Sequence, residues 1–206
     1  MSGVRIGIDF DNTIICYDEV FAATARQRGL VPEGWAGLKS QLRDYLRAKP
    51  GGESAWQGLQ GWVYGKGIGG AEIFPGMADF LAACRRAGAD VYIVSHKTQF
   101  GHQDPDRTDL RVAARHWIRA AGLIGAVDSA LRPDCIYFED TLAAKVDRVV
   151  SLELDVFIDD LVDVFEQPHF PHRTRPVLFA GTAAASHGRY RSAATWADVQ
   201  REVFPT

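Results

Sequence analysis

The sequence predicts an α/β protein with a doubly wound, mainly parallel sheet and a small α-helical insertion after the first strand. Three observations favour this class. A short apolar strand opens the chain and ends in two acidic residues. Strand and helix patterns alternate from residue 73 onward, which is typical of a parallel sheet with helices on both faces. Residues 17–70, between these two regions, show only helical patterns.

The first strand covers residues 4–8 and runs into the sequence DFDNT at residues 9–13. Residues two apart in an extended chain point to the same face, so Asp9 and Asp11 are expected to converge. Two like charges in an apolar setting are costly unless a cation or a proton relieves them. At the carboxyl end of a parallel strand, such a pair suits a hard metal ion. The alternative is a surface turn after an edge strand, where Asp and Asn are common.

The insertion is expected to contain three helices. The first starts with Asp18 as its N-cap and stops before Gly29. Apolar and aromatic residues then recur at helical spacing over residues 35–46 and 54–63. Residues 65–70 contain four glycines and are expected to form a hinge.

The remaining chain alternates between strands and helices. Glycines at the ends of the periodic segments, and apolar runs of three to six residues, set the expected boundaries. The expected elements are a helix from 75 to 87, a strand at 90–95, a helix at 110–121, a strand at 135–138, a helix at 141–150, strands at 156–158 and 176–180, and a helix at 192–204.

Composition excludes several classes of function. The chain has 206 residues and a formal net charge of -3, so nucleic-acid binding driven by neutralisation of phosphates is not expected. It contains no 18-residue apolar run and no charged-then-apolar leader, so neither a membrane span nor a signal peptide is expected. Its three cysteines, Cys16, Cys84 and Cys135, lie in apolar contexts and are expected to be reduced. We therefore expect a cytoplasmic protein.

Four polar signals fall where strands, or the helices after them, would deliver them to one edge of the sheet. Each alone has an ordinary structural explanation: a turn, a helix cap or a solvated helix residue. Their common position and their order along the chain are much harder to explain in that way. The four signals are Asp9/Asp11/Thr13, Ser95, Lys145 and Asp159/Asp160.

This arrangement resembles the haloacid dehalogenase (HAD) superfamily, in its Asp-x-Asp-x-Thr phosphatase type. Residues 9–13 match the first motif, and the apolar strand ending in Ser95 matches the second. Lys145 and the apolar run into Asp159-Asp160 match the third and fourth. The resemblance covers nearly the whole chain. It implies a Rossmann-like core formed by residues 1–16 and 71–206, with residues 17–70 as a small helical cap.

The resemblance also implies catalytic roles. Asp9 would attack phosphorus and form an aspartyl-phosphate. Asp11 would protonate the leaving alcohol and then activate water. The presence of this second aspartate favours phosphate esters over carbon–halogen bonds. Lys145 would neutralise the charge on Asp9 and the phosphoryl group, so Lys145→Ala is predicted to be folded but catalytically crippled.

A Mg²⁺ ion is implied as the cofactor. Its ligands would be the side chain of Asp9, the backbone carbonyl of Asp11 and the fourth motif. Within that motif we favour Asp160 as the direct ligand and Asp159 as an outer carboxylate, an order that the sequence leaves open. The phosphate group is expected to be held by the backbone amides that follow Asp9, in Phe10, Asn12 and Thr13. Ser95 and His96 of the second motif, and Lys145, are expected to contact it as well.

The reading implied by the resemblance is a Mg²⁺-dependent phosphatase acting on a small phosphorylated substrate, and other readings stay open. A response-regulator receiver uses similar residues, but its acidic pair lies at the first strand, whereas the adjacent pair here comes last. A non-catalytic relative that binds phosphate or a partner protein is a rival from another class. A phosphotransferase or mutase is a rival within enzymes. The substrate, the role of the polar loop at 96–107 and the oligomeric state are not readable, although the cap and exposed aromatic residues could support a homodimer.

Overall fold

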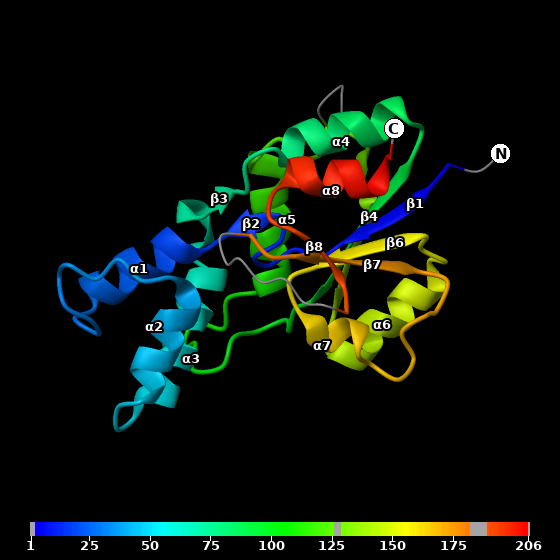
Figure 1. Cartoon of the computed structure of the whole chain (residues 1–206). Helices are drawn as coiled ribbons and strands as arrows, with labels where there is room; N and C mark the ends of the chain where they lie inside the picture. Colours follow the sequence, from blue (N-terminus) through cyan, green and yellow to red (C-terminus); the bar gives the residue numbers. More distant parts are fainter. Residues whose placement is uncertain (1–2, 126–128, 182–188, 206) are drawn as a thin grey trace. The chain divides into compact units, whose positions relative to one another are not determined.

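The computed structural model describes residues 3–125, 129–181 and 189–205 (Figure 1). The chain forms two compact units. The sheet unit comprises Met1–Ile15, Ile73–Lys97 and Ala121–Thr206. The helical unit comprises Cys16–Glu72 and Thr98–Ala120. The chain passes between the units four times. Two of these passages lie within the short strands β2 (Ile15–Cys16) and β3 (Glu72–Ile73), which form a two-stranded sheet of their own.

The sheet unit is built on a six-stranded sheet in the order β5-β4-β1-β6-β7-β8. Every neighbouring pair of strands in this sheet is parallel. The chain must therefore cross over between the ends of the sheet to connect paired strands. This confirms the predicted α/β class. The strands are β1 (Arg5–Ile8), β4 (Asp90–His96), β5 (Leu131–Glu139), β6 (Val156–Asp159), β7 (Arg175–Phe179) and β8 (Arg191–Ala193).

The register of the central strands brings their carboxyl ends to one edge. Ile8 of β1 is paired with Ile93 of β4 on one side and with Ile158 of β6 on the other. The backbone N–H of Asp9 continues this ladder by donating to the carbonyl of Ile158 at 2.8 Å. Residues that follow these three isoleucines in sequence therefore gather at the same edge. In an open parallel sheet this is the edge where ligands bind.

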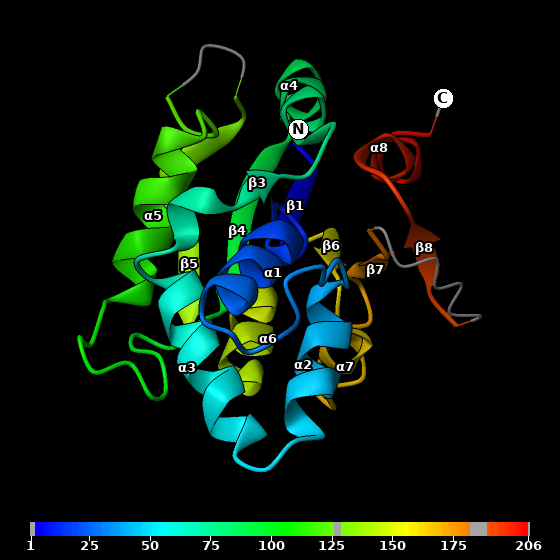
Figure 2. The same ribbon diagram turned by 90° about the vertical axis from the view of Figure 1, so that its left-hand side faces the viewer.

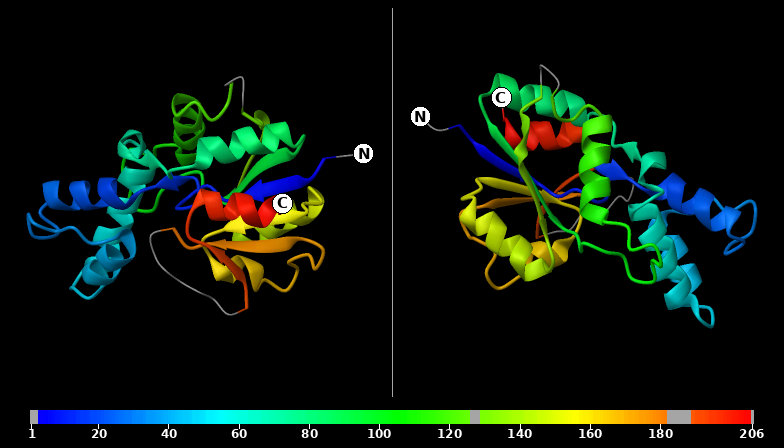
Figure 3. Two further views of the ribbon diagram at one scale, coloured as in Figure 1. Left: turned by 45° about the horizontal axis from the view of Figure 1, so that its top comes forward. Right: turned by 180° about the vertical axis from the view of Figure 1, so that it is seen from behind.

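Helices cover both faces of the sheet. Helices α4 (Met77–Arg86) and α8 (Trp196–Val203) lie on one face, and α6 (Leu142–Ser151) and α7 (Val162–Phe165) lie on the other (Figures 1 and 3). Trp196 links α8 to both of its neighbours. Its ring centroid lies 5.0 Å from that of Phe80 in α4 and 5.3 Å from that of Phe179 in β7. Burial of aromatic rings of this size is a main source of packing energy in a core.

The last elements differ from the sequence prediction. A helix was expected from residue 192, but residues 191–193 form strand β8 and α8 begins only at Trp196. The Thr195 side chain caps the helix by accepting from the Asp198 N–H. Strand β8 exists because it pairs with β7, a contact that no local pattern of three residues reveals. Strand β5 likewise begins at Leu131 rather than at residue 135, through polar residues that are exposed.

Figure 2 shows the helices of the helical unit, which packs around aromatic side chains. Phe21 stacks on Trp56 with a centroid distance of 5.1 Å and meets Tyr64 edge-on at 5.6 Å. Tyr17 meets Tyr64 edge-on at 4.9 Å. These rings give a small unit the large apolar contacts it needs. Its elements are α1 (Asp18–Gln27), α2 (Lys39–Arg47), α3 (Gly52–Tyr64), the 3₁₀ turn η1 (Ile68–Gly70) and α5 (Leu110–Ala120).

The extent of the helical unit also differs from the prediction. The sequence analysis placed residues 98–120 in the core, whereas the structure groups Thr98–Ala120 with the insertion. Two contacts explain this grouping. The indole N–H of Trp117 donates to the carbonyl of Ala71 at 3.1 Å. The backbone at Gly101 approaches that of Gly61 so closely that a Cβ on Gly101 would lie 2.7 Å from the Gly61 Cα.

The start of α1 is organised differently from the expectation. Asp18 was predicted to be the N-cap, but the helix begins at Asp18 and its N-cap is Tyr17. The Asp18 carboxylate instead accepts from the backbone N–H of Lys39 at 2.8 Å, at the start of α2. Asp18 therefore ties two helices of the insertion together rather than capping its own.

The helices are short. Crossing a membrane takes about 20 predominantly apolar residues. Within residues 3–125, 129–181 and 189–205, no helix has the length and apolar character to span a bilayer.

Candidate active site

The chain turns sharply after β1, and this turn presents the first acidic pair. Asn12 has a φ of +59°, a conformation that Asn tolerates better than most residues. The Phe10 carbonyl accepts from the N–H groups of both Ile14 and Ile15, at 3.1 and 3.2 Å. The Asn12 N–H donates to the carbonyl of Ile15 at 2.9 Å. The loop is therefore fixed by its own backbone.

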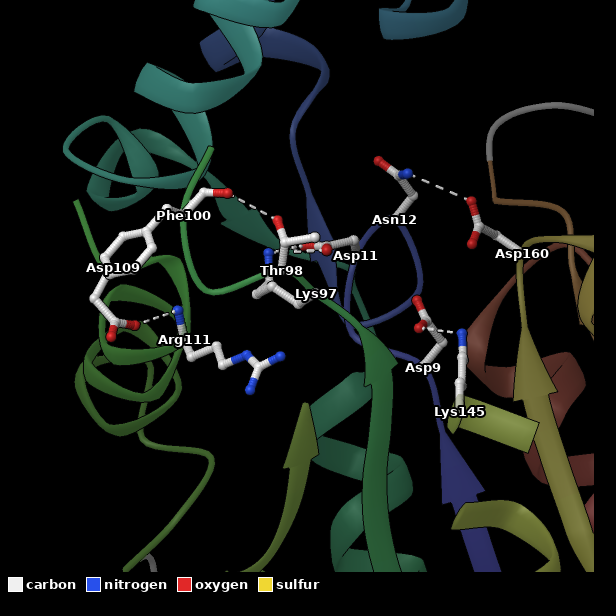
Figure 4. A network of polar contacts seen from close by, with 10 residues as sticks. All are labelled: Asp9, Asp11, Asn12, Lys97, Thr98, Phe100, Asp109, Arg111, Lys145 and Asp160. Atoms are coloured by element: carbon white, nitrogen blue, oxygen red, sulfur yellow. Dashed lines mark hydrogen bonds and ion pairs between the residues drawn. The ribbon is translucent and has the colours of Figure 1, made fainter. Parts of the chain in front are cut away.

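Asp9, Lys145 and Asp159 form a buried ionic cluster. Each comes from a different segment: the end of β1, helix α6 and the end of β6. Lys145 Nζ lies 2.6 Å from Asp9 Oδ1 (Figure 4). It also lies 2.6 Å from Asp159 Oδ2. All three side chains are at most 5% exposed. Such burial is tolerated because the charges are paired.

The cluster shifts the ionisation of its members. Burial alone lowers the pKa of Lys145, but the carboxylates of Asp159 and Asp9 outweigh this and raise that pKa above its ordinary value. Burial raises the pKa of Asp159, and the charge of Asp9 adds to that effect against the attraction of Lys145. The Asp159 carboxylate also accepts from the Leu161 N–H at 3.0 Å. Lys145 is therefore firmly cationic at this edge of the sheet.

Three carboxylates at this edge could hold a metal ion together. One oxygen each of Asp9, Asp159 and Asp160 lies within 4.8 Å of the other two. Asp160 is partly exposed, and its Oδ2 lies 3.4 Å from the Asn12 side-chain nitrogen, which donates to it (Figure 4). Against these three acids Lys145 supplies one positive charge, so the ionised set has an excess of negative charge. Carboxylate oxygens with such an excess fit a hard divalent cation such as Mg²⁺.

Two hydroxyl groups near this edge are buried without a hydrogen-bond partner among the described residues. They are Ser95 Oγ, in β4, and Thr13 Oγ1, in the loop after β1. Both residues are at most 1% exposed. Buried polar atoms are nearly always satisfied in folded proteins, so unsatisfied ones need an explanation. A ligand with acceptor oxygens would satisfy both.

The structure places a second buried lysine at this edge that the sequence analysis did not select. Lys97 Nζ lies 3.1 Å from Asp11 Oδ1 and 2.9 Å from Asp11 Oδ2 (Figure 4). The side chain of Lys97 is 2% exposed and that of Asp11 is 19% exposed. A usable signal was present, because Lys97 is two residues beyond Ser95 and so faces the same side of an extended chain. The sequence analysis instead assigned Lys97 to a polar loop.

The structure places the remaining expected site residues as follows. His96 is exposed, and its Nε2 lies 3.1 Å from the Asp140 carbonyl, so the structure does not join its side chain to the cluster. The Asn12 N–H is already donated to Ile15, whereas its side chain meets Asp160. The Phe10 ring is buried edge-on against Phe138 at 6.0 Å. The Asp11 carboxylate faces Lys97 and is not one of the three that converge.

Comparison with known proteins rests on the fold. No protein-family model and no curated protein sequence matches the chain. Solved structures of haloacid dehalogenase-type hydrolases do. A HAD-like hydrolase from Streptococcus pneumoniae has a TM-score of 0.61 at 15% identity, with 98% of this chain and 99% of that chain covered. A HAD family hydrolase from Deinococcus radiodurans, solved with phosphate and sodium, has a TM-score of 0.59 at 14% identity, with 98% and 95% covered.

A third match extends this comparison. The HAD hydrolase YfnB from Bacillus subtilis, solved with magnesium, has a TM-score of 0.60 at 9% identity, and both chains are covered completely. These likenesses span nearly the whole of each chain. The protein therefore has the α/β fold of the HAD hydrolases, as the four motifs predicted.

Proposed function

We propose that this protein is a HAD-type phosphatase, a Mg²⁺-dependent enzyme that hydrolyses a phosphate monoester through an aspartyl-phosphate on Asp9. One observation carries the proposal. Three segments far apart in the sequence bring the Lys145 ammonium within ion-pair distance of the buried Asp9 and Asp159, with the carboxylate of Asp160 beside these two acids. Strongly perturbed charges gathered at the carboxyl edge of a parallel sheet are a feature of active sites.

The first chemical step would transfer the phosphoryl group to Asp9. A carboxylate oxygen of Asp9 forms a bond to phosphorus while the ester P–O bond breaks, and its electron pair goes to the leaving oxygen. The proton of the Asp11 carboxyl group moves to that oxygen, which departs as an alcohol. The product of this step is the aspartyl-phosphate, with Asp11 left as a carboxylate.

The second step would return the enzyme to its starting state. The Asp11 carboxylate takes a proton from water as the water oxygen forms a bond to phosphorus. The bond between phosphorus and the Asp9 oxygen breaks, and its electron pair returns to Asp9 as a carboxylate. Inorganic phosphate leaves, and Asp11 is protonated again. Ester and water are thereby converted into alcohol and phosphate.

The remaining residues would hold charge and position. Asp9 and Asp160 would bind Mg²⁺ through their side chains and Asp11 through its backbone carbonyl, with Asp159 outside them. When bound, the ion would supply positive charge against the phosphoryl oxygens. Lys145 would add a second positive charge beside Asp9. The hydroxyl groups of Ser95 and Thr13, for which the described part of the chain provides no hydrogen-bond partner, would donate to phosphate oxygens.

The substrate is proposed to be a small phosphorylated molecule. The helical unit is proposed to act as a cap, because it is inserted directly after the first motif. The composition supports neither nucleic acid nor a membrane as a partner. A cytoplasmic location and a homodimer remain predictions from the sequence.

A panel of phosphate esters tests the proposal. Purified protein should release phosphate from at least one ester with Mg²⁺ and not with EDTA. Asp9→Asn should lower kcat by at least about 10⁴-fold, because the attacking oxygen is lost. Asp147→Asn, an exposed aspartate on the same helix as Lys145, is the matched control and should retain the wild-type rate. Phosphate binding without turnover of any ester would favour a binding protein instead.

A further inference from the structure

We propose that Lys97 is a positioning residue for Asp11: its ammonium group fixes the carboxyl group that exchanges protons with the leaving alcohol and with water. This inference rests on the proposed function, because it assigns a role within that reaction. It concerns a residue that lies outside the four motifs. The evidence is the burial, the contacts and the anchoring of Lys97.

The side chain of Lys97 is almost completely buried, which is unusual for a lysine. Its side chain is 2% exposed. Fully buried lysines are uncommon and need a partner for their charge. The Asp11 carboxylate is such a partner, and the Phe10 ring, with its centroid 5.6 Å from Nζ, provides a second favourable contact. The charge of Lys97 is thus directed at the loop that carries the first acidic pair.

The contact constrains the whole Asp11 carboxylate rather than one of its oxygens. Nζ lies 3.1 Å from Oδ1 and 2.9 Å from Oδ2, so both oxygens meet the same ammonium group. Rotation of the carboxylate about its own bond would break one of these contacts. A single cation therefore sets both the position and the plane of the group.

Lys97 is itself held by the sheet. Its backbone N–H donates to the carbonyl of Glu139 at 2.9 Å. The residues before it, Ser95 and His96, are paired in register with Phe138 and Glu139 of β5. The ammonium group is therefore carried by the end of a central strand, not by a free loop. Groups that take part in proton transfer gain from this kind of rigid support.

The two buried lysines serve different acids. Lys145 contacts Asp9 and Asp159, the residues proposed for phosphorus attack and for the metal site. Lys97 contacts Asp11, whose side chain lies outside the group of three converging carboxylates. The proposed nucleophile and the proposed proton donor thus have separate cations. Loss of Lys97 should impair proton transfer and leave the attack on phosphorus largely intact.

Leaving groups of different acidity separate these two effects. An alkyl phosphate releases a strongly basic alkoxide that must be protonated as it leaves, whereas 4-nitrophenyl phosphate releases a stable phenolate that needs little help. Proton transfer by a positioned group contributes about 10²–10⁴-fold. Lys97→Met keeps the length of the side chain and removes its charge. We expect it to lower kcat/KM for the alkyl ester by about 10²-fold, and for the aryl ester by less than about 10-fold.

Four further variants complete the experiment. Asp11→Asn should show the same selective loss, and adding Lys97→Met to it should cause no further selective loss, because both act through one proton. Lys97→Arg keeps the charge and moves the donor, so a smaller selective loss of about 10-fold is expected. Lys49→Met, at an exposed lysine, is the matched control and should leave both rates unchanged. Circular dichroism establishes that each variant is folded.

The outcomes are distinct. Equal losses on both esters for a folded Lys97→Met, or no loss on either, would overturn the positioning role. If Lys97→Met does not fold, Lys97→Arg decides by the same ratio of alkyl to aryl rates. A wild-type protein inactive on every ester would refute the proposed function itself, and this inference with it.

Discussion

The two units of this protein bury different kinds of side chain. Among the described residues, the sheet unit buries Asp9, Thr13, Ser95, Lys97, Lys145, Asp159 and Thr174 as polar or charged side chains, whereas the helical unit buries only Thr24. The Thr24 hydroxyl is satisfied locally, because it donates to the Val20 carbonyl at 2.7 Å one turn earlier in the same helix. The helical unit relies on stacked rings, with Phe21 and Trp56 at its centre.

This difference indicates where the chemistry resides. A small helical unit gains stability from apolar contacts and has no need of buried charge. The sheet unit places buried acids and lysines at one edge, where they cost desolvation energy that a purely structural core would avoid. Proteins accept such costs at functional sites. Variants of the two units should therefore fail in different ways.

Among the variants that compare the two units, the largest change in catalytic rate is expected at Lys145. Lys145→Ala removes the cation shared by Asp9 and Asp159, and we expect kcat to fall by about 10²–10³-fold in a folded protein. Steady-state assays with Mg²⁺, together with circular dichroism, measure both properties. Lys49→Ala is the control for the loss of an exposed lysine. A rate close to that of the wild type would remove Lys145 from the site.

A core variant of the helical unit should instead affect stability. Phe21→Ala removes a fully buried ring stacked on Trp56, and we expect the free energy of unfolding to fall by about 3–5 kcal/mol. Val112→Ala, at an exposed position of α5, should change it by less than about 0.5 kcal/mol. Urea denaturation provides both values. An unchanged free energy of unfolding in Phe21→Ala would contradict the claim that the helical unit depends on its aromatic core.

The smallest effect is expected from metal binding. At a concentration 100 times its Kd, a ligand specific to the folded state stabilises a protein by about 2.7 kcal/mol. Mg²⁺ should therefore raise the thermal midpoint of the wild type, and Asp160→Asn should lose most of that shift. Asp163→Asn, three residues further on, is the control and should keep the shift. An equal shift in both variants would exclude Asp160 as a ligand.

Several features could be predicted because they depend on short stretches of the sequence. Apolar runs that end in an acid or a hydroxyl define strand ends, and parallel pairing then brings those ends together. This logic predicted the α/β class and the edge where Asp9, Lys145 and Asp159 meet. It needs only the position of each apolar strand and the rule that strands alternating with helices pair in parallel, so that their carboxyl ends share one edge.

Other features depend on contacts distant in sequence. Strand β8 is three residues long and exists through its pairing with β7. Residues 98–120 join the helical unit through contacts such as that of Trp117 with Ala71. Lys97 lies in a run of polar residues, and although its spacing from Ser95 places it on the same side of the chain, its pairing with Asp11 is seen only in the structure. The side chain of His96, its neighbour, is exposed, because adjacent residues of an extended chain face opposite sides.

A crystal structure of the protein with Mg²⁺ and phosphate tests the central claim most directly. The account predicts one ion with oxygens of Asp9 and Asp160 at about 2.0–2.1 Å. It also predicts a phosphate group within hydrogen-bond distance of Ser95 and Lys145, with its phosphorus facing a free Asp9 oxygen. An ion and a phosphate bound elsewhere, with the contacts between Lys145, Asp9 and Asp159 unchanged, would contradict it.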